Sequence, residues 1–169
     1  MSALIYRLLA KILNQRLSLI TELDKRQKAF IRGIDGCGEN TFLLKTVTAT
    51  ARREHRELCI ASLDVAKAFD SVSHHLVLHA LARQSVDPRT ITLVMNLLAE
   101  SFARIEHSEG ISAPIMILRG VKQIDPLSPL LFSLIIDELV DELEISKAGF
   151  TVAPVVSIGS LVFADDILL

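Results

Sequence analysis

The sequence has little of several features that mark specialised classes of protein. Its two cysteines, Cys37 and Cys59, form no CxxC pair, and the five scattered histidines complete no zinc-ligand pattern with them. No apolar run approaches the roughly 20 residues of a membrane-spanning helix. The opening stretch alternates apolar residues with Arg and Lys, unlike a signal peptide. These absences favour reduced thiols, an intracellular location and no membrane partner.

Charge is nearly balanced overall but is unevenly distributed along the chain. The formal net charge is −2, half of the residues are hydrophobic and 22% are charged, which is typical of a globular domain. Residues 1–60 hold 11 Lys or Arg and 6 Asp or Glu, a net +5, whereas residues 61–169 hold 7 and 14, a net −7. A basic first third suits a phosphate backbone and an acidic remainder suits cations. An ordinary solvated surface also gives this pattern.

Apolar periodicity and capping signals predict several helices. Apolar residues at helical spacing predict a helix over residues 4–17, with Ser2 as its candidate N-cap. A second helix is expected from about Asn40 to Arg56, after glycines that break the preceding structure. Three more are expected to start at capping signals and to cover about residues 73–84, 87–102 and 128–144.

Short apolar runs predict strands between these helices. LCIASLDV (58–65) is typical of a buried strand that ends near an aspartate, and two short strands are expected near residues 103–107 and 113–118. SLVFADDILL (160–169) predicts a hairpin with Asp165-Asp166 at its tip. The sequence therefore predicts an α+β fold, with helices packed on one face of a small antiparallel sheet.

Three aspartates, Asp64, Asp165 and Asp166, lie within these apolar runs. Burying a carboxylate without a partner costs several kcal/mol or more, and neither run contains a Lys or Arg. Mg²⁺ prefers such hard oxygen ligands. Aspartates from two neighbouring strands could hold two ions about 3.5–4 Å apart, an arrangement that stabilises phosphoryl transfer. Taken alone, however, an Asp-Asp pair is also typical of an ordinary turn.

Three segments together resemble the motifs of reverse transcriptases. LDVAKAFDSV (63–72), GVKQIDPLSPLLFSLIIDEL (120–139) and FADD (163–166) occur in the order and rough spacing of that family. They look most like non-LTR retrotransposons, particularly the insect elements that insert into ribosomal RNA genes. ALIYRLLAKILNQRL (3–17) and QKAFIRGIDGCGENTFLL (27–44) resemble the finger region of the same family.

The resemblance implies the fingers and palm of a right-hand polymerase, with the thumb absent from this chain. About residues 1–60 would be fingers-like, and about residues 61–169 would be mostly palm with a helical fingers insertion. The abrupt helical start and the apolar end at Leu169 suggest a fragment of a larger polyprotein. Its remaining domains, including an endonuclease, would lie elsewhere, and it would act in the nucleus.

The resemblance also implies roles for individual residues. The metal ligands of the family match Asp64, Asp165 and Asp166, and the backbone carbonyl of Val65 would be a further ligand. Phe69 matches the aromatic residue that lies under the sugar of the incoming nucleotide and excludes a 2′-hydroxyl, although core packing would also explain it. Gln123 matches a contact of the incoming nucleotide, and Phe163 and Ala164 match the lining of the primer terminus. Contacts to template or triphosphate are expected from four basic residues, Arg32, Arg52, Arg53 and Arg56.

The motifs contain two other aspartates and one departure from the family pattern. Asp70 and Asp125 are expected to form local hydrogen bonds rather than to bind metal. The family pattern RQGDPLSP reads KQIDPLSP here, so that Ile124 replaces a glycine. A β-branched residue is a poor occupant of a site that needs unusual backbone torsion angles or close approach of a ligand. We therefore expect Ile124 to lower polymerase activity.

The implied reaction is RNA-templated addition of deoxynucleoside triphosphates to a DNA primer, with two Mg²⁺ ions or Mn²⁺ in their place. Two other functions compete with it. One is a catalytically impaired relic or maturase-like domain that binds RNA, which Ile124 favours and the three aspartates oppose. The other is a palm-fold nucleotide cyclase, which has no need of the GVKQ segment or of Phe69.

Overall fold

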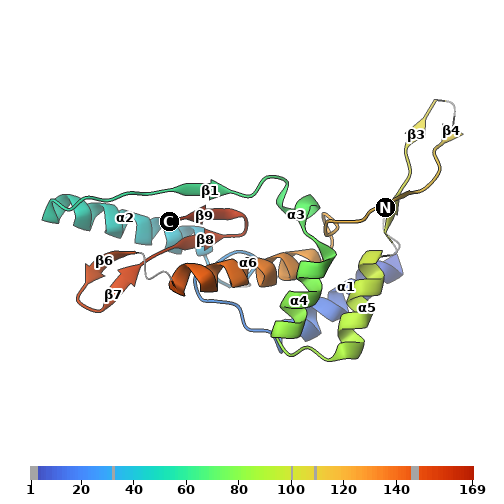
Figure 1. Ribbon diagram of the computed structural model, residues 1–169, viewed down its shortest axis with the longest axis horizontal. Coiled ribbons are helices and arrows are strands. Elements are labelled where there is room, and N and C mark those ends of the chain that lie inside the picture. Colours follow the sequence, from blue (N-terminus) through green and yellow to red (C-terminus); the bar gives the residue numbers. More distant parts are fainter. Residues whose placement is uncertain (1–3, 32, 100, 109, 146–148) are drawn as a thin grey trace. The chain divides into compact units, whose positions relative to one another are not determined.

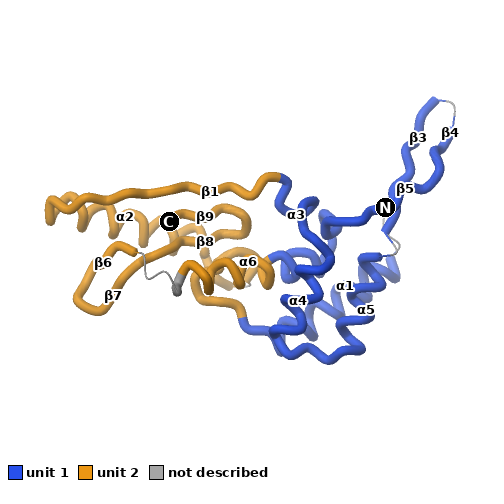
Figure 2. Tube along the Cα trace, viewed as in Figure 1, with its two compact units in different colours: residues 1–22, 67–132 blue, residues 23–66, 133–169 orange. Residues whose placement is uncertain are grey.

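The computed structural model describes residues 4–31, 33–99, 101–108, 110–145 and 149–169, and its two compact units are built from interleaved segments (Figure 1, Figure 2). Unit 1 contains residues 1–22 and 67–132, and unit 2 contains residues 23–66 and 133–169. Helices and small antiparallel sheets together confirm the α+β class. Ser2 and Arg32 lie outside the described residues. Within the described ranges, no helix is both long and apolar enough to span a membrane.

Unit 1 is mostly helical, as its apolar periodicity predicts. Its helices are α1 (Leu4–Leu17), α3 (Ala68–Ser71), α4 (His74–Arg83), α5 (Pro88–Ala99) and the start of α6 (Ser128–Ile145). The predicted caps are confirmed at α4 and α5. The Ser73 hydroxyl accepts a hydrogen bond from the His75 N–H, and the Asp87 carboxylate accepts from the N–H groups of Arg89 and Thr90. The four-residue α3 was not predicted, because one helical turn is too short to show a period.

A narrow β arm extends from unit 1 (Figure 1). It consists of two antiparallel pairs, β2 (Phe102–Ala103) with β5 (Ile115–Met116) and β3 (Glu106–His107) with β4 (Gly110–Ile111). The sequence predicted two longer strands and a helix that continued to Phe102. Helix α5 instead ends at Ala99, because Phe102 begins the arm and pairs with Met116.

Unit 2 contains α2 (Gly36–Glu54), most of α6 and a three-stranded sheet. The strands are β1 (Ser62–Asp64), β9 (Asp166–Leu168) and β8 (Leu161–Phe163), in the order β1-β9-β8 and all antiparallel. Helix α2 packs against β8, and Val47 and Ala51 of the helix are buried together with Val162 and Ile167 of the sheet. A second hairpin, β6 (Phe150–Ala153) with β7 (Val156–Ile158), was not predicted.

Helix α2 begins earlier than predicted, at Gly36 rather than near Asn40. The Asp35 carboxylate caps it by accepting a hydrogen bond from the Gly38 N–H at 3.1 Å. A Cβ at Gly36 would collide with Lys28, and one at Gly38 would collide with the capping carboxylate itself. These glycines therefore permit close approach within the first helical turn, and the prediction that they break the helix was wrong.

The strand predicted over residues 58–65 is shorter and more exposed than expected. Only Ser62–Asp64 forms β1, and all three residues are exposed, with Leu63 at 45% of its full accessibility. The reason is strand order, since β1 pairs with β9 and lies at the edge of the sheet. The prediction of a buried strand was therefore wrong.

Candidate active site

The register of the three-stranded sheet sets two of the predicted metal ligands against each other. Asp64, the last residue of β1, is the antiparallel partner of Asp166, the first residue of β9. Directly opposed residues project from the same face of a sheet, with Cβ atoms about 4.5–5.5 Å apart. Both residues belong to unit 2, so the pair lies within one compact unit.

The third aspartate lies in the turn beside this pair. The β8–β9 hairpin is confirmed, but its two-residue turn is Ala164-Asp165, because Phe163 pairs with Asp166. Asp166 is therefore a strand residue, and the prediction that both aspartates form the tip was wrong by one position. Ala164 has φ +55, the positive φ that a two-residue hairpin turn requires of its first residue.

The surroundings of the aspartates change the electrostatic reasoning. Asp64 and Asp166 are exposed and Asp165 is half-buried, so the premise of carboxylates inside a core was wrong. Like charges directly opposite each other across two strands nevertheless destabilise the pairing. Within the part of the chain that is described, no Lys or Arg side chain forms an ion pair with any of the three aspartates. A cation held between Asp64 and Asp166 would relieve this repulsion.

Hard carboxylate oxygens on opposed strands suit Mg²⁺ in kind. Among the described residues, however, no group of three or more His, Cys, Asp or Glu side chains lies close enough together to hold a metal ion. The structure brings Asp64 and Asp166 into opposition and leaves Asp165 in the adjoining turn. The chemistry of the donors suits the ion, but the described structure opposes only two of the three carboxylates.

The neighbours of the aspartates have mixed burial. Val65 follows β1 and is half-buried, Phe163 ends β8 and is half-buried, and Ala164 is buried. The buried side chain of Gln27 accepts a hydrogen bond from the Ala164 N–H at 3.0 Å. This contact of Gln27 was not predicted, because a contact over 137 residues leaves no local pattern.

Phe69 and Gln123 belong to unit 1, and each is held by a contact within that unit. Phe69 stacks on Phe132 with ring centroids 5.1 Å apart and planes inclined by 17°. The Gln123 side-chain NH₂ donates to both carboxylate oxygens of Asp70, at 3.1 and 3.3 Å. Asp70 therefore forms a hydrogen bond, as predicted, but with a partner 53 residues away rather than with a local one.

The loop that carries Gln123 is held tightly against α3. The Gly120 N–H donates to the Val72 carbonyl at 2.7 Å and the Val121 N–H to the Phe69 carbonyl at 2.8 Å. Gly120 has φ +94, and a Cβ there would press on the Asp70 backbone at 3.1 Å, so only glycine fits easily. Phe69 and Gln123 are thus carried on segments that are bonded to each other.

The rest of this loop is fixed through Tyr6 of α1. The Lys122 ammonium lies 4.0 Å from the centre of the Tyr6 ring. Burial, followed by the nearby charge of Asp125 and the hydrogen bond to it, raises the pKa of the Tyr6 phenol above its ordinary value. Asp125 also accepts from the Leu127 N–H at 2.8 Å, which confirms its predicted local role.

Ile124 lies in the same loop in a conformation that suits glycine. Its φ is +62 and its side chain is 93% exposed. A β-branched residue rarely adopts this left-handed region, which costs an L-residue roughly 1–2 kcal/mol. The backbone at position 124 therefore favours glycine, the residue that the family pattern has there.

The basic residues predicted to contact template or triphosphate are partly engaged within the protein. Arg53 and Arg56 form ion pairs with Glu54 at 3.1 and 3.2 Å, and hydrogen bonds from both lower the pKa of Glu54. Arg56 also lies 4.0 Å from the centre of the Phe150 ring and donates to the Thr151 carbonyl. Arg52 is exposed near the end of α2.

Comparison with known proteins identifies relatives over the whole chain. The family model described as "Reverse transcriptase (RNA-dependent DNA polymerase)" matches residues 1–169. Among curated relatives, Pol polyproteins of type-1 retrotransposable element R2 are 41% identical in Popillia japonica, over 96% of this chain, and 42% identical in Nasonia vitripennis, over 94%. The polyprotein of type-2 element R2DM from Drosophila melanogaster is 34% identical over 99% of the chain. The chain spans 23%, 15% and 16% of the length of these three relatives.

Solved structures support the fold. Telomerase from Candida albicans, in complex with a TWJ fragment of telomeric RNA, matches 96% of this chain with a TM-score of 0.64 and 14% identity, over 30% of the telomerase chain. The corresponding Candida tropicalis complex matches 98% of this chain and 28% of that chain, with a TM-score of 0.58 and 11% identity. At these identities the likeness concerns the fold alone.

Proposed function

The chain belongs to the reverse transcriptase family, and we propose that it is the catalytic core of an RNA-directed DNA polymerase in a retrotransposon polyprotein. It adds deoxynucleotides to the 3′ end of a DNA primer, copying an RNA template. The observation that carries this proposal is the register that opposes Asp64 to Asp166 beside Asp165. These residues come from two of the three ordered motifs of the family.

Asp64, Asp165 and Asp166 are proposed as the metal ligands, with the Val65 backbone carbonyl as an additional oxygen. When bound, two Mg²⁺ ions supply the positive charge that lowers the pKa of the primer hydroxyl and stabilises the departing pyrophosphate. The contribution of the chain is to hold the carboxylates in place before the reaction, since such catalysis consists mostly of positioning and electrostatics. Phe163 and Ala164 line the primer terminus.

Phe69 and Gln123 are proposed as the contacts of the incoming nucleotide. Stacking on Phe132 fixes the Phe69 ring, which lies under the sugar and leaves no room for a 2′-hydroxyl. Because a carboxylate only accepts hydrogen bonds, Asp70 turns the NH₂ end of Gln123 toward itself and the carbonyl end away. Gln123 therefore presents a hydrogen-bond acceptor to the nucleotide.

We assign residues 1–60 to a fingers-like part and residues 61–169 mostly to the palm, with a helical fingers insertion. RNA template, DNA primer and deoxynucleoside triphosphates are the proposed partners, with other domains of a polyprotein supplying an endonuclease. The proposed location is the nucleus, where the target DNA lies. The R2 polyproteins, which this chain resembles at up to 42% identity, support the polyprotein context.

One observation favours a second function, an impaired relic or maturase-like domain that binds RNA without polymerising. Ile124 holds a positive φ beside Gln123, so the loop that carries a proposed nucleotide contact is strained. Nothing in the described structure favours the nucleotide cyclase.

Primer extension by the full-length protein tests these alternatives. An RNA template with an annealed DNA primer is supplied with deoxynucleotides, with and without Mg²⁺, and Asp165→Ala serves as the control. Magnesium-dependent extension that Asp165→Ala abolishes would support the polymerase. RNA binding without extension, even after Ile124→Gly, would support the relic instead.

A further inference from the structure

The turn between β8 and β9 is held by a segment far away in the sequence. Residues 24–28 run beside β8, where Gln27 forms a parallel bridge with Val162 and the Lys28 N–H donates to the Val162 carbonyl at 3.2 Å. The Asn40 side chain donates to the same carbonyl at 3.1 Å. All of these residues belong to unit 2.

Gln27 connects this segment to the turn itself. Its Oε1 accepts hydrogen bonds from the Ala164 N–H at 3.0 Å and from the Ala29 N–H at 3.1 Å. The side chain is 0% exposed, and its NH₂ has no hydrogen-bond partner among the described residues. A buried amide that uses only its acceptor end indicates that the acceptor is what this position requires.

The backbone of the turn explains that requirement. Ala164 has a positive φ without being glycine, a conformation that persists only where the surroundings enforce it. The hydrogen bond from its N–H to Gln27 is such a constraint, and it acts one residue before Asp165 and two before Asp166. A shift of Ala164 would therefore move both aspartates.

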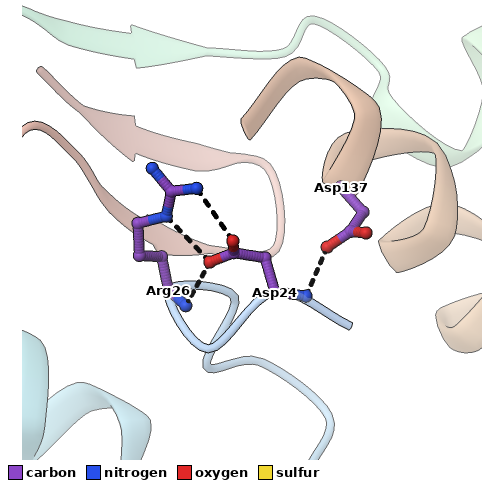
Figure 3. Close-up of polar contacts among 3 residues, drawn as sticks. All are labelled: Asp24, Arg26 and Asp137. Carbon is purple, nitrogen blue, oxygen red and sulfur yellow. Dashed lines mark hydrogen bonds and ion pairs between the residues drawn. The ribbon is translucent and has the colours of Figure 1, made fainter. Parts of the chain in front are cut away.

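The segment that leads to Gln27 is anchored through Asp24, which contacts Arg26 and Asp137 (Figure 3). The Asp24 N–H donates to the Asp137 carboxylate of α6 at 2.6 Å, and Asp24 accepts from the Arg26 guanidinium on both carboxylate oxygens at 2.8 Å. The Gln27 N–H donates to the Asp24 carbonyl at 3.0 Å. The segment is thus anchored to α6 at one end and to the turn at the other.

We propose that Gln27 is a positioning residue that locks the Ala164-Asp165 turn, and through it the proposed metal ligands Asp165 and Asp166. The catalytic importance of this lock rests on the proposed polymerase function. The lock itself is a property of the fold and can be measured without catalysis.

The test compares Gln27→Met, which keeps the size but removes the acceptor, with Gln27→Glu, whose fully buried carboxyl group is expected to stay protonated and neutral and so to keep a carbonyl oxygen at the same reach. Thr50→Val is the matched control, since Thr50 is a buried polar residue of α2 that makes no hydrogen bond to the turn within the described residues. Hydrogen–deuterium exchange of the full-length protein is followed over residues 161–169. Gln27→Met is expected to speed exchange at the Ala164 amide by about tenfold or more, and the other two variants to leave it unchanged.

Single-turnover primer extension by the same variants supplies the second measurement. Gln27→Met is expected to lower the incorporation rate by about 10- to 100-fold, with the burst amplitude and the nucleotide KM nearly unchanged, because misplaced ligands slow the chemical step. Gln27→Glu should stay within about threefold of the unsubstituted protein. A lower amplitude at an unchanged rate would mean that Gln27 serves folding only, and would overturn the proposal.

Other outcomes are equally decisive. Unchanged exchange at Ala164 in Gln27→Met, or equal losses in Gln27→Glu, would show that the acceptor does not hold the turn. If the unsubstituted protein shows no magnesium-dependent extension while Gln27→Met still loosens the turn, the proposed function fails and the lock stands.

Discussion

At the scale of single residues, Ile124 is the one β-branched residue that has a positive φ among the described residues. Its φ of +62 costs an L-residue roughly 1–2 kcal/mol, whereas glycine there would lose about 0.5–1 kcal/mol through the greater freedom of the unfolded chain. Ile124→Gly is therefore expected to raise the free energy of unfolding by about 0.5–1 kcal/mol and to increase the incorporation rate.

Thermal unfolding and primer extension of Ile124→Gly measure these two effects. Leu118→Gly is the matched control, since Leu118 is also exposed and apolar but has no positive φ, and it should not gain stability. An equal response of the two variants would show that the strain at Ile124 is unimportant.

Asp70 and Gln123 form a pair whose coupling can be measured. If Asp70 acts only by orienting the Gln123 amide, then Asp70→Ala and Gln123→Ala should each raise the nucleotide KM by about tenfold, or 1.4 kcal/mol. The double substitution should then be no worse than the more severe single one. Nucleotide titrations of the four proteins complete this cycle, and additive effects would show that the two residues act separately.

At the scale of elements, helix caps could be predicted from the sequence, whereas the order of strands in the sheet could not. Ser73 and Asp87 cap their helices as predicted, because a cap depends on residues within one turn. The exposure of β1 could not be predicted, because the sequence LCIASLDV is compatible with an edge strand as well as with a central strand. Asp64 was therefore found as a candidate ligand, but for a partly wrong reason, since it is exposed rather than buried.

The contacts that hold the candidate active site in place could not be predicted from local sequence either. Gln27 looks like an ordinary polar residue of a basic loop until the chain brings residue 164 to it. The glycines before Asn40 indicated a break, yet they allow the Asp35 cap and the approach of Lys28. Contacts between distant segments, rather than local propensity, decide these features.

The segment that holds Gln27 should respond to acid through Asp24. The hydrogen bond from Arg26 lowers the pKa of Asp24 below its ordinary value of 3.8. A carboxylate with a depressed folded-state pKa stabilises the fold above its unfolded pKa, and this contribution disappears as the pH falls through the folded-state pKa. Asp24→Asn should therefore cost about 1 kcal/mol near pH 6 and progressively less as the pH falls below 3.8.

Thermal unfolding between pH 3 and pH 6 measures this difference. Arg26→Gln removes the main cause of the lowered pKa and should lose the same part of the pH dependence. A pH profile unchanged in Asp24→Asn would contradict the assignment.

At the scale of the whole molecule, each unit joins segments from both halves of the chain. Unit 2 joins β1 to β8 and β9, which lie about a hundred residues later, and that pairing alone opposes Asp64 to Asp166. Two like charges at this contact should destabilise the metal-free protein by a few tenths of a kcal/mol. A bound cation would reverse the sign, since a ligand that binds only the folded state stabilises it by mass action.

Asp64→Asn should therefore have opposite effects on thermal stability in the two conditions. In EDTA it removes the repulsion and should raise the melting temperature slightly. In millimolar Mg²⁺ or Mn²⁺ the unsubstituted protein should gain stability that Asp64→Asn does not, so that their order reverses. Glu57→Gln, which removes one exposed charge from the same unit, should leave the response to metal intact. An equal gain in Asp64→Asn would place the cation elsewhere and leave the opposition of Asp64 and Asp166 without a catalytic purpose.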